Sequence, residues 1–214
     1  QYFEKALKSL NAIDWHWELH YDLTLRLYRA LGNVELCLGN FDNGKALFDT
    51  ILEKAKTVHV KLKTYLSIAQ ALGRCDKHEE ALEMDLKALS IISNFPKRFL
   101  PIHLISDMNF IKSAFRKMTN NEILNLPMLE DKDKLLFLKV LSSMWVRAYM
   151  CKKMVLTLFC IARGLCTTLQ YGLSPPGAHA FGAYGSLLCG PLADYKTGVR
   201  LGKLSHKILE LTKD

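Results

Sequence analysis

The stretch YRALGNVELCLGNFDNGKALFDTI, residues 28–51, decides the fold class. Its apolar residues recur at intervals of three and four on both sides of Gly39-Asn40, which is the spacing of helices and not the alternation of strands. The Gly-Asn pair ends the first helical pattern and leaves room for only a short turn. A small residue at Gly44 lets two helices approach closely. The stretch therefore predicts an antiparallel helical hairpin.

The same stretch fits the pattern of a tetratricopeptide unit, and the pattern returns further along the chain. Such a unit has about 34 residues, with a bulky residue and Leu-Gly in its first helix and small and aromatic residues in its second. The first unit uses Tyr28, Leu31, Gly32, Gly39, Phe41, Gly44, Phe48 and Ile51; the second uses Tyr65, Ile68, Ala69, His78, Ala81 and Ala88; a third, weaker unit uses Tyr195, Gly198, Gly202 and Ser205. The step from Gly44 to Ala81 is 37 residues and residues 96–173 fit poorly, so the pattern predicts tetratricopeptide-like hairpins and not a strict repeat.

Helical spacing extends over almost the whole of the 214 residues, and no run of alternating strands with hairpin turns is present. Helices are expected over about 2–10, 17–38, 42–56, 58–73, 77–92, 101–117, 131–151, 154–171, 177–189 and 194–212. We expect an all-α fold, a tetratricopeptide-like α-solenoid of antiparallel helical hairpins. Hairpins over 1–95 would be followed by irregular helical repeats of the same solenoid over 96–214. Because the chain begins with Gln1 inside a helical pattern, we expect it to be a segment of a longer protein.

The order of several short motifs resembles the helical-repeat region of very large signalling ATPases. These motifs are WELHYDLTLRLY (17–28), Gly39-Asn40-Phe41, ALEMDLKAL (81–89), LPM (126–128), QYGLS (170–174) and DYKTGVRLG (194–202). Proteins of this kind combine a Ser/Thr-kinase-like domain, an AAA/STAND-type ATPase and tetratricopeptide-like helices, and many add GAF and histidine-kinase or cyclase domains. None of their enzymatic signatures occurs in these residues, so the resemblance implies a non-catalytic scaffold region without cofactor. Its expected partners are neighbouring domains of the same polypeptide, a protein effector or a second copy, and neither a membrane nor nucleic acid.

One alternative interpretation makes the chain a nucleotide-binding domain. Residues 39–45, GNFDNGK, spell the G-x-x-x-x-G-K pattern of a phosphate-binding loop, in which backbone N–H groups and a Lys hold phosphates. This interpretation would use Gly39, Gly44 and Lys45. Ala46 stands where such a loop carries the hydroxyl that binds Mg²⁺, and residues 34–38 would have to form a strand.

The net charge of +8 is concentrated late in the chain, where residues 140–214 contain nine Lys and Arg against three Asp and Glu. Lys196, Arg200, Lys203 and Lys207 follow helical spacing beside an apolar stripe. They form either a solvated helix face or a surface for an anionic partner, because a basic surface attracts phosphates and acidic proteins.

Other candidate sites are weaker. His16 and His20 have the i, i+4 spacing of zinc ligands but no third ligand at fixed spacing, and Cys75 and His78 lie together without an orienting group. We therefore expect no catalytic, cofactor-binding or metal-binding residue. The six Cys include no C-x-x-C pair, which is typical of reduced thiols in a cytoplasmic chain. The apolar segments 154–162 and 164–193 are interpreted as buried helices, because Arg163 and several Gly and Pro residues interrupt them.

Overall fold

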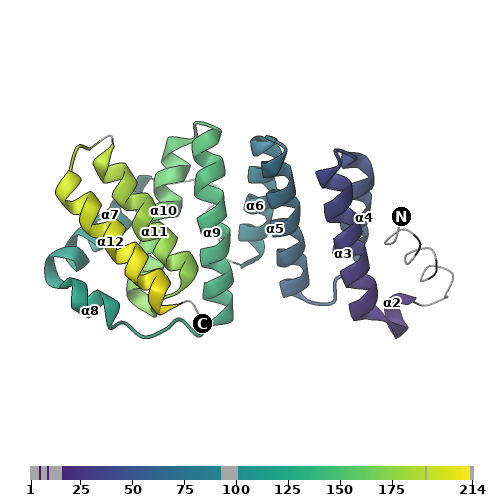
Figure 1. Cartoon of the computed structure of the whole chain (residues 1–214), viewed down its shortest axis with the longest axis horizontal. Coiled ribbons are helices and arrows are strands. Elements are labelled where there is room, and N and C mark those ends of the chain that lie inside the picture. The colour runs from purple at the N-terminus through teal and green to yellow at the C-terminus, as the bar shows by residue number, and fades with distance from the viewer. Residues whose placement is uncertain (1–4, 6–8, 10–15, 93–100, 191, 213–214) are drawn as a thin grey trace. The chain divides into compact units, whose positions relative to one another are not determined.

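The computed structural model describes residues 5, 9, 16–92, 101–190 and 192–212, and every regular element in them is a helix (Figure 1). The all-α prediction is therefore confirmed. The chain divides into two compact units, Gln1–Ser93 and Asn94–Asp214. Apart from Lys5 and Ser9, the helix expected over 2–10 lies outside the described residues.

Residues 16–92 of unit 1 form a short helix followed by two helical hairpins. Helix α2 (His16–Leu19) precedes the pair α3 (Tyr21–Cys37) and α4 (Phe41–Lys54), and the second pair is α5 (Val58–Arg74) and α6 (His78–Ile92). Helix α5 contacts both helices of the first pair, so the hairpins pack side by side. Phe48 and Ile51 of α4 are fully buried in the core between them, and the ring of Trp17 lies 5.0 Å from that of Tyr28.

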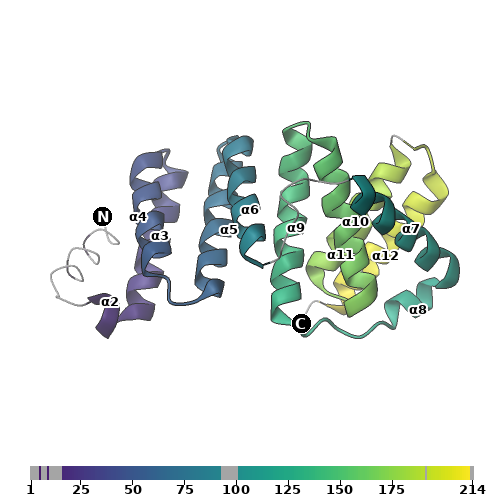
Figure 2. The same cartoon turned by 180° about the vertical axis from the view of Figure 1, so that it is seen from behind.

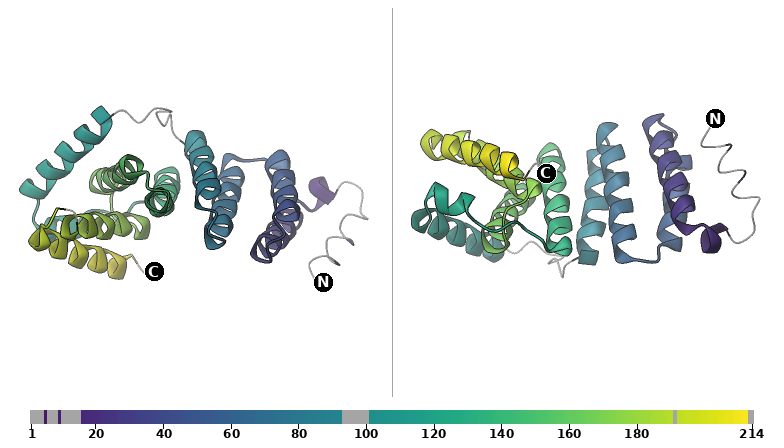
Figure 3. Two further views of the ribbon diagram at one scale, coloured as in Figure 1. Left: turned by 90° about the horizontal axis from the view of Figure 1, so that it is seen from above. Right: turned by 60° about the horizontal axis from the view of Figure 1, so that its bottom comes forward.

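Unit 2 contains two further hairpins and two additional helices. The hairpins are α9 (Lys132–Met150) with α10 (Met154–Tyr171) and α11 (Pro175–Cys189) with α12 (Tyr195–Leu211). Helix α7 (Pro101–Lys117) packs across α10, as Figure 2 shows, and the short α8 (Asn120–Leu124), which the sequence pattern did not predict, contacts α12. Figure 3 shows α10 and α11 between α7 and α12, and the fully buried ring of Phe181 on α11 lies in this core.

The turns of the four described hairpins share one backbone feature. A residue with left-handed backbone lies two positions before each second helix, and these residues are Gly39 (φ 85°), Asp76 (φ 60°), Lys152 (φ 57°) and Ala193 (φ 50°). In the first three turns, the residue directly after the left-handed one donates its N–H to the carbonyl five residues before it, over distances of 2.9, 3.0 and 2.8 Å. The fourth turn is longer, and there the N–H of Asp194 donates to the Leu188 carbonyl. A left-handed residue with such a bond is a common helix ending, because it satisfies a carbonyl that the helix leaves free.

This shared turn aligns the hairpins residue by residue. Five positions after the left-handed residue stand Gly44, Ala81, Thr157 and Gly198, all buried, and each donates its N–H to a carbonyl four residues earlier at 3.0 Å. Thr157 shows that α9–α10 is a hairpin of the same design, although the sequence pattern did not identify one there. The same alignment makes α11, with Phe181, Tyr184 and Gly185, the first helix of the last hairpin.

Candidate protein-binding groove

A groove of about 400 Å³ runs between α4 and α6 in unit 1, with α5 as its floor. Its apolar lining consists of Leu36, Phe41, Leu52, Tyr65, Ile68, Leu72 and Met84, and its charged rims consist of Asp42, Lys45 and Asp49 on α4 and Lys77, Glu80, Glu83 and Lys87 at α6. We call these residues the unit 1 groove. Its combination of an apolar floor and charged edges is typical of surfaces that bind an amphipathic segment.

Helical spacing explains how the rims arise from the sequence. Asp42, Lys45 and Asp49 are separated by three and four residues, so their side chains follow one edge of α4. Glu80, Glu83 and Lys87 follow one edge of α6 for the same reason. Each rim therefore carries both acidic and basic groups, which a bound segment can meet with charges of either sign.

Lys77 contacts residues on both sides of the groove. Its ammonium nitrogen lies 3.9 Å from the centroid of the Phe41 ring and 3.3 Å from Glu80 Oε1. Phe41 begins α4 and Lys77 directly precedes α6, so this side chain links the starts of the two second helices. A cation over an aromatic ring at a partly exposed site contributes about 0.5–1 kcal/mol. The contact therefore helps to hold the two walls at a fixed separation.

Most of the predicted packing residues lie inside their units. Tyr28, Leu31, Gly32, Gly44, Phe48, Ala69, Ala81, Ala88 and Gly198 are all buried. Phe41 and Tyr65 are half-buried and line the unit 1 groove, while Gly39 is exposed and occupies its turn because glycine adopts positive φ without strain. A Cβ added at Gly44 would lie 2.7 Å from the Leu36 side chain, which shows how closely α3 and α4 approach.

Two predicted packing residues on α12 are wrong. The Tyr195 side chain is 64% exposed, and a Cβ added at Gly202 would meet nothing within 4 Å. The sequence pattern treated the start of α12 as a first helix, whereas α12 is the second helix of the α11–α12 hairpin. Ser205 does contact the partner helix, because its hydroxyl donates to the Ala178 carbonyl at 2.8 Å.

The geometry around Gly39 contradicts a phosphate-binding loop. Such a loop follows a strand, whereas residues 34–37 are the last turn of α3. Lys45 lies in the second turn of α4 and lines the unit 1 groove. Gly44 faces the side chain of Leu36, so its small size serves helix packing.

The other candidate residues from the sequence do not form catalytic or metal-binding groups in the described part of the chain. Cys75 Sγ donates to the Leu36 carbonyl at 3.6 Å, whereas His78 Nε2 lies 3.0 Å from Asp76 Oδ1, so the two do not form a Cys–His pair. His20 is exposed, and the side chain of His16 lies outside the described residues. No group of three or more His, Cys, Asp or Glu side chains that could hold a metal ion occurs in the described part of the chain. Lys196, Lys203 and Lys207 are exposed, and Arg200 is half-buried.

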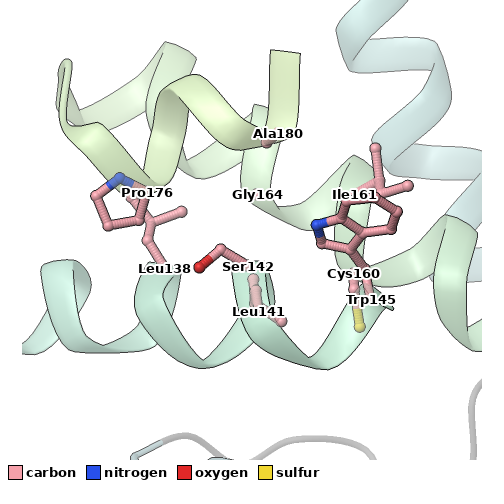
Figure 4. A pocket seen from close by; sticks show the side chains of 9 residues that line it. All are labelled: Leu138, Leu141, Ser142, Trp145, Cys160, Ile161, Gly164, Pro176 and Ala180. Atoms are coloured by element: carbon pink, nitrogen blue, oxygen red, sulfur yellow. The ribbon is translucent and has the colours of Figure 1, made fainter. Parts of the chain in front are cut away.

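A much smaller hollow lies in the core of unit 2, between α9, α10 and α11 (Figure 4). Its volume is about 10 Å³, which is close to the least that one water molecule requires. Its lining includes Leu138, Leu141, Trp145 and Ile161. The hollow is therefore a packing gap of the core and offers no space for a ligand.

One described helix, Met154–Tyr171, is long and apolar enough to cross a membrane, and 67% of it is buried inside the protein. It is α10, which contacts α7, α9 and α11. A central helix of a folded unit has this composition because it is covered on most sides by its neighbours.

Comparisons of the chain with protein-family models, curated proteins and solved structures give no match. The fold and the unit 1 groove are therefore the observations on which a function has to be argued. The resemblance to the helical regions of signalling ATPases stays a prediction.

Proposed function

We propose that this chain is a non-catalytic helical-repeat region that binds protein segments, and that the unit 1 groove is its binding site. The observation that carries the proposal is the groove itself, which joins an apolar floor to two rims of mixed charge. An amphipathic helix or peptide would place its apolar side chains on Tyr65, Ile68 and Met84 and its charged side chains against the rims.

The four equivalent hairpins support this function. Hairpins with the same turn stack into α-solenoids, whose extended surfaces serve as binding platforms for other proteins. From the resemblance we further propose that the chain is part of a large cytoplasmic signalling ATPase or kinase, where its partners are neighbouring domains, an effector protein or a second copy.

Selection of peptides from a displayed library against the whole chain tests the groove. Met84→Glu places a carboxylate on the half-buried apolar wall, and the cost of burying it should lower the affinity of selected peptides at least about ten-fold. The control Ser90→Glu adds the same charge to an exposed position of α6 outside the groove and should leave affinity unchanged.

A second variant guards against loss of folding in the first. Lys45→Glu reverses one charge on the exposed rim and should change which peptides are selected, with no change in the circular dichroism spectrum. Peptides that bind all three variants as they bind the original chain would show that the groove is not the binding site.

A further inference from the structure

The net positive charge of the chain lies in unit 2. Residues 94–214 contain 17 Lys and Arg against eight Asp and Glu, whereas residues 1–93 contain 12 against 13. A compact unit with such an excess attracts anions over distances of about 10 Å at ordinary salt concentrations. The position of these charges on the helices decides whether they act together.

Two helices of unit 2 carry exposed basic side chains. On α12, Lys196, Lys203 and Lys207 are exposed along one side of the helix. On α7, Lys112, Arg116 and Lys117 are exposed in the last turns of the helix. These three residues, with Ser113, also line a surface hollow of about 450 Å³. We call the six Lys and Arg side chains of both helices the basic surface.

Arg200 connects the two groups. Its Nε donates to Asn120 Oδ1 at 2.6 Å, and its Nη2 donates to the Met118 carbonyl at 3.4 Å. Because Met118 directly follows Lys117, this bond sets the second turn of α12 against the end of α7. The second turn of α12 therefore lies beside Met118 and Asn120, the residues that follow the basic end of α7.

Nearby carboxylates are held by other groups, although Asp194 also attracts Lys196. Glu122 is held in its own helix cap by the backbone N–H and hydroxyl of Thr119, and Asp194 caps α12 by accepting from Thr197 N. Glu210 lies 3.5 Å from His206. Among the described residues, none of the six side chains of the basic surface forms an ion pair.

The chemistry of the surface favours carboxylates over nucleic acid. Five of its six cations are lysines, which as point charges attract carboxylates and phosphates alike, so the neighbouring side chains decide between the two. Binding of single-stranded nucleic acid also requires aromatic rings on which bases stack. Tyr195 is the exposed aromatic residue of α12, and it lies about 100° around the helix from Lys196.

We propose that the basic surface docks an acidic segment of a partner protein, and that it does so independently of the unit 1 groove. Lys196 and Lys207 are 11 residues apart on one helix, which corresponds to about 16 Å. A partner helix with Glu residues three, four and seven positions apart carries a matching row of carboxylates over that length.

Fluorescence anisotropy tests this assignment with a labelled 16-residue helical peptide. The peptide carries Glu along one side of the helix, three, four and seven positions apart, and Ala at the other positions. The whole chain should bind the peptide, and the affinity should fall as salt rises. Lys196→Ala, Lys203→Ala and Lys207→Ala together should lower the affinity about ten-fold, since three ion pairs of modest strength are lost. The matched control removes three exposed lysines of unit 1, Lys54, Lys61 and Lys63, and should retain the affinity of the original chain.

A single-stranded oligonucleotide with the same number of charges is the competing probe. Tighter binding of the oligonucleotide, lost in the α12 triple variant, would replace the acidic segment by nucleic acid and overturn the proposal. Absence of peptide binding at low salt, or equal loss in both triple variants, would overturn it as well. Because all substituted lysines are exposed, thermal unfolding should be unchanged in both triple variants.

Discussion

Gly198→Ala should destabilise the protein although alanine is the better helix former. A Cβ at this position of α12 would lie 2.8 Å from the Gly185 carbonyl oxygen and 3.2 Å from the Cys189 backbone nitrogen, in addition to a contact with Cys189 Sγ. The two backbone atoms belong to α11 and cannot rotate away, so α11 and α12 have to separate. Overpacking of this kind costs about 1–3 kcal/mol, and the backbone contacts favour the upper part of that range.

The gain in helix propensity from Gly to Ala, about 1 kcal/mol, offsets part of this cost. A net loss of about 2 kcal/mol should lower the melting temperature by about 4–8 °C in a chain of this length. Gly202→Ala is the matched control one turn later on the same helix. An added Cβ meets nothing within 4 Å there, so the same substitution should stabilise by about 0.5–1 kcal/mol.

Thermal and urea unfolding followed by circular dichroism at 222 nm measure both variants against the original chain. Opposite signs for the two substitutions are expected. If Gly198→Ala stabilised the protein as much as Gly202→Ala, the close approach of α11 and α12 at this glycine would be refuted.

Three further outcomes follow from the turns, the caps and the buried thiols. Lys152→Gly should stabilise the α9–α10 turn by about 1 kcal/mol, because a left-handed backbone conformation is strained for a residue with a side chain. Gly39→Ala should destabilise the α3–α4 turn by a similar amount for the same reason. Urea unfolding measures both variants, and a change of the same sign in both would contradict the shared turn. Hydrogen bonds from the Thr197 side chain and backbone lower the pKa of Asp194, so the stabilisation from its carboxylate is present above the pKa of the unfolded state and is lost as pH falls through the lower folded value. Asp194→Asn should keep the helix cap and lose this pH dependence in thermal melts between pH 2 and 6. An unchanged pH profile in the variant would count against this role of Asp194. Burial raises the pKa of Cys166 to about 12, so iodoacetamide at pH 8 should modify exposed Cys37 well before Cys166 in the folded chain, and equal rates would show that Cys166 is accessible.

The sequence predicted the helices well because their boundaries carry local signals. Pro101 at the first position and Arg116-Lys117 in the last turn mark α7, and its predicted bounds agree with the structure. Ser174 before Pro175-Pro176 marks the start of α11, where its hydroxyl accepts from Gly177 N. The capping box of Thr119 and Glu122 was a signal of α8 that the periodicity alone did not reveal.

The repeat alignment in unit 2 could not be predicted from residue types. Trp145 stands where the other first helices have Gly32, Ala69 and Gly185, and Thr157 stands where the second helices have Gly44, Ala81 and Gly198. Lys152 occupies a left-handed turn position at which glycine would have signalled the turn. Tyr195 was misassigned because α12 was taken without α11, whose apolar composition hides its helical face.

The unit 1 groove was not predicted, although the sequence patterns singled out Phe41, Lys45, Tyr65 and Ile68 of its lining for other reasons. Its two walls belong to different hairpins, and their separation depends on how α5 packs against α3 and α4. Sequence spacing determines which side chains share the edge of one helix, but it does not determine the distance between two helices. Only the folded unit therefore shows that Lys45 and Tyr65 line the same groove.

Hydrogen–deuterium exchange of the whole chain with a library-selected peptide tests the central claim most directly. The proposal predicts slower exchange in residues 41–52 and 77–87, which form the two walls of the unit 1 groove, and little change in the α3 residues 23–35. Protection that falls elsewhere, with the walls of the groove exchanging as in the free chain, would contradict it.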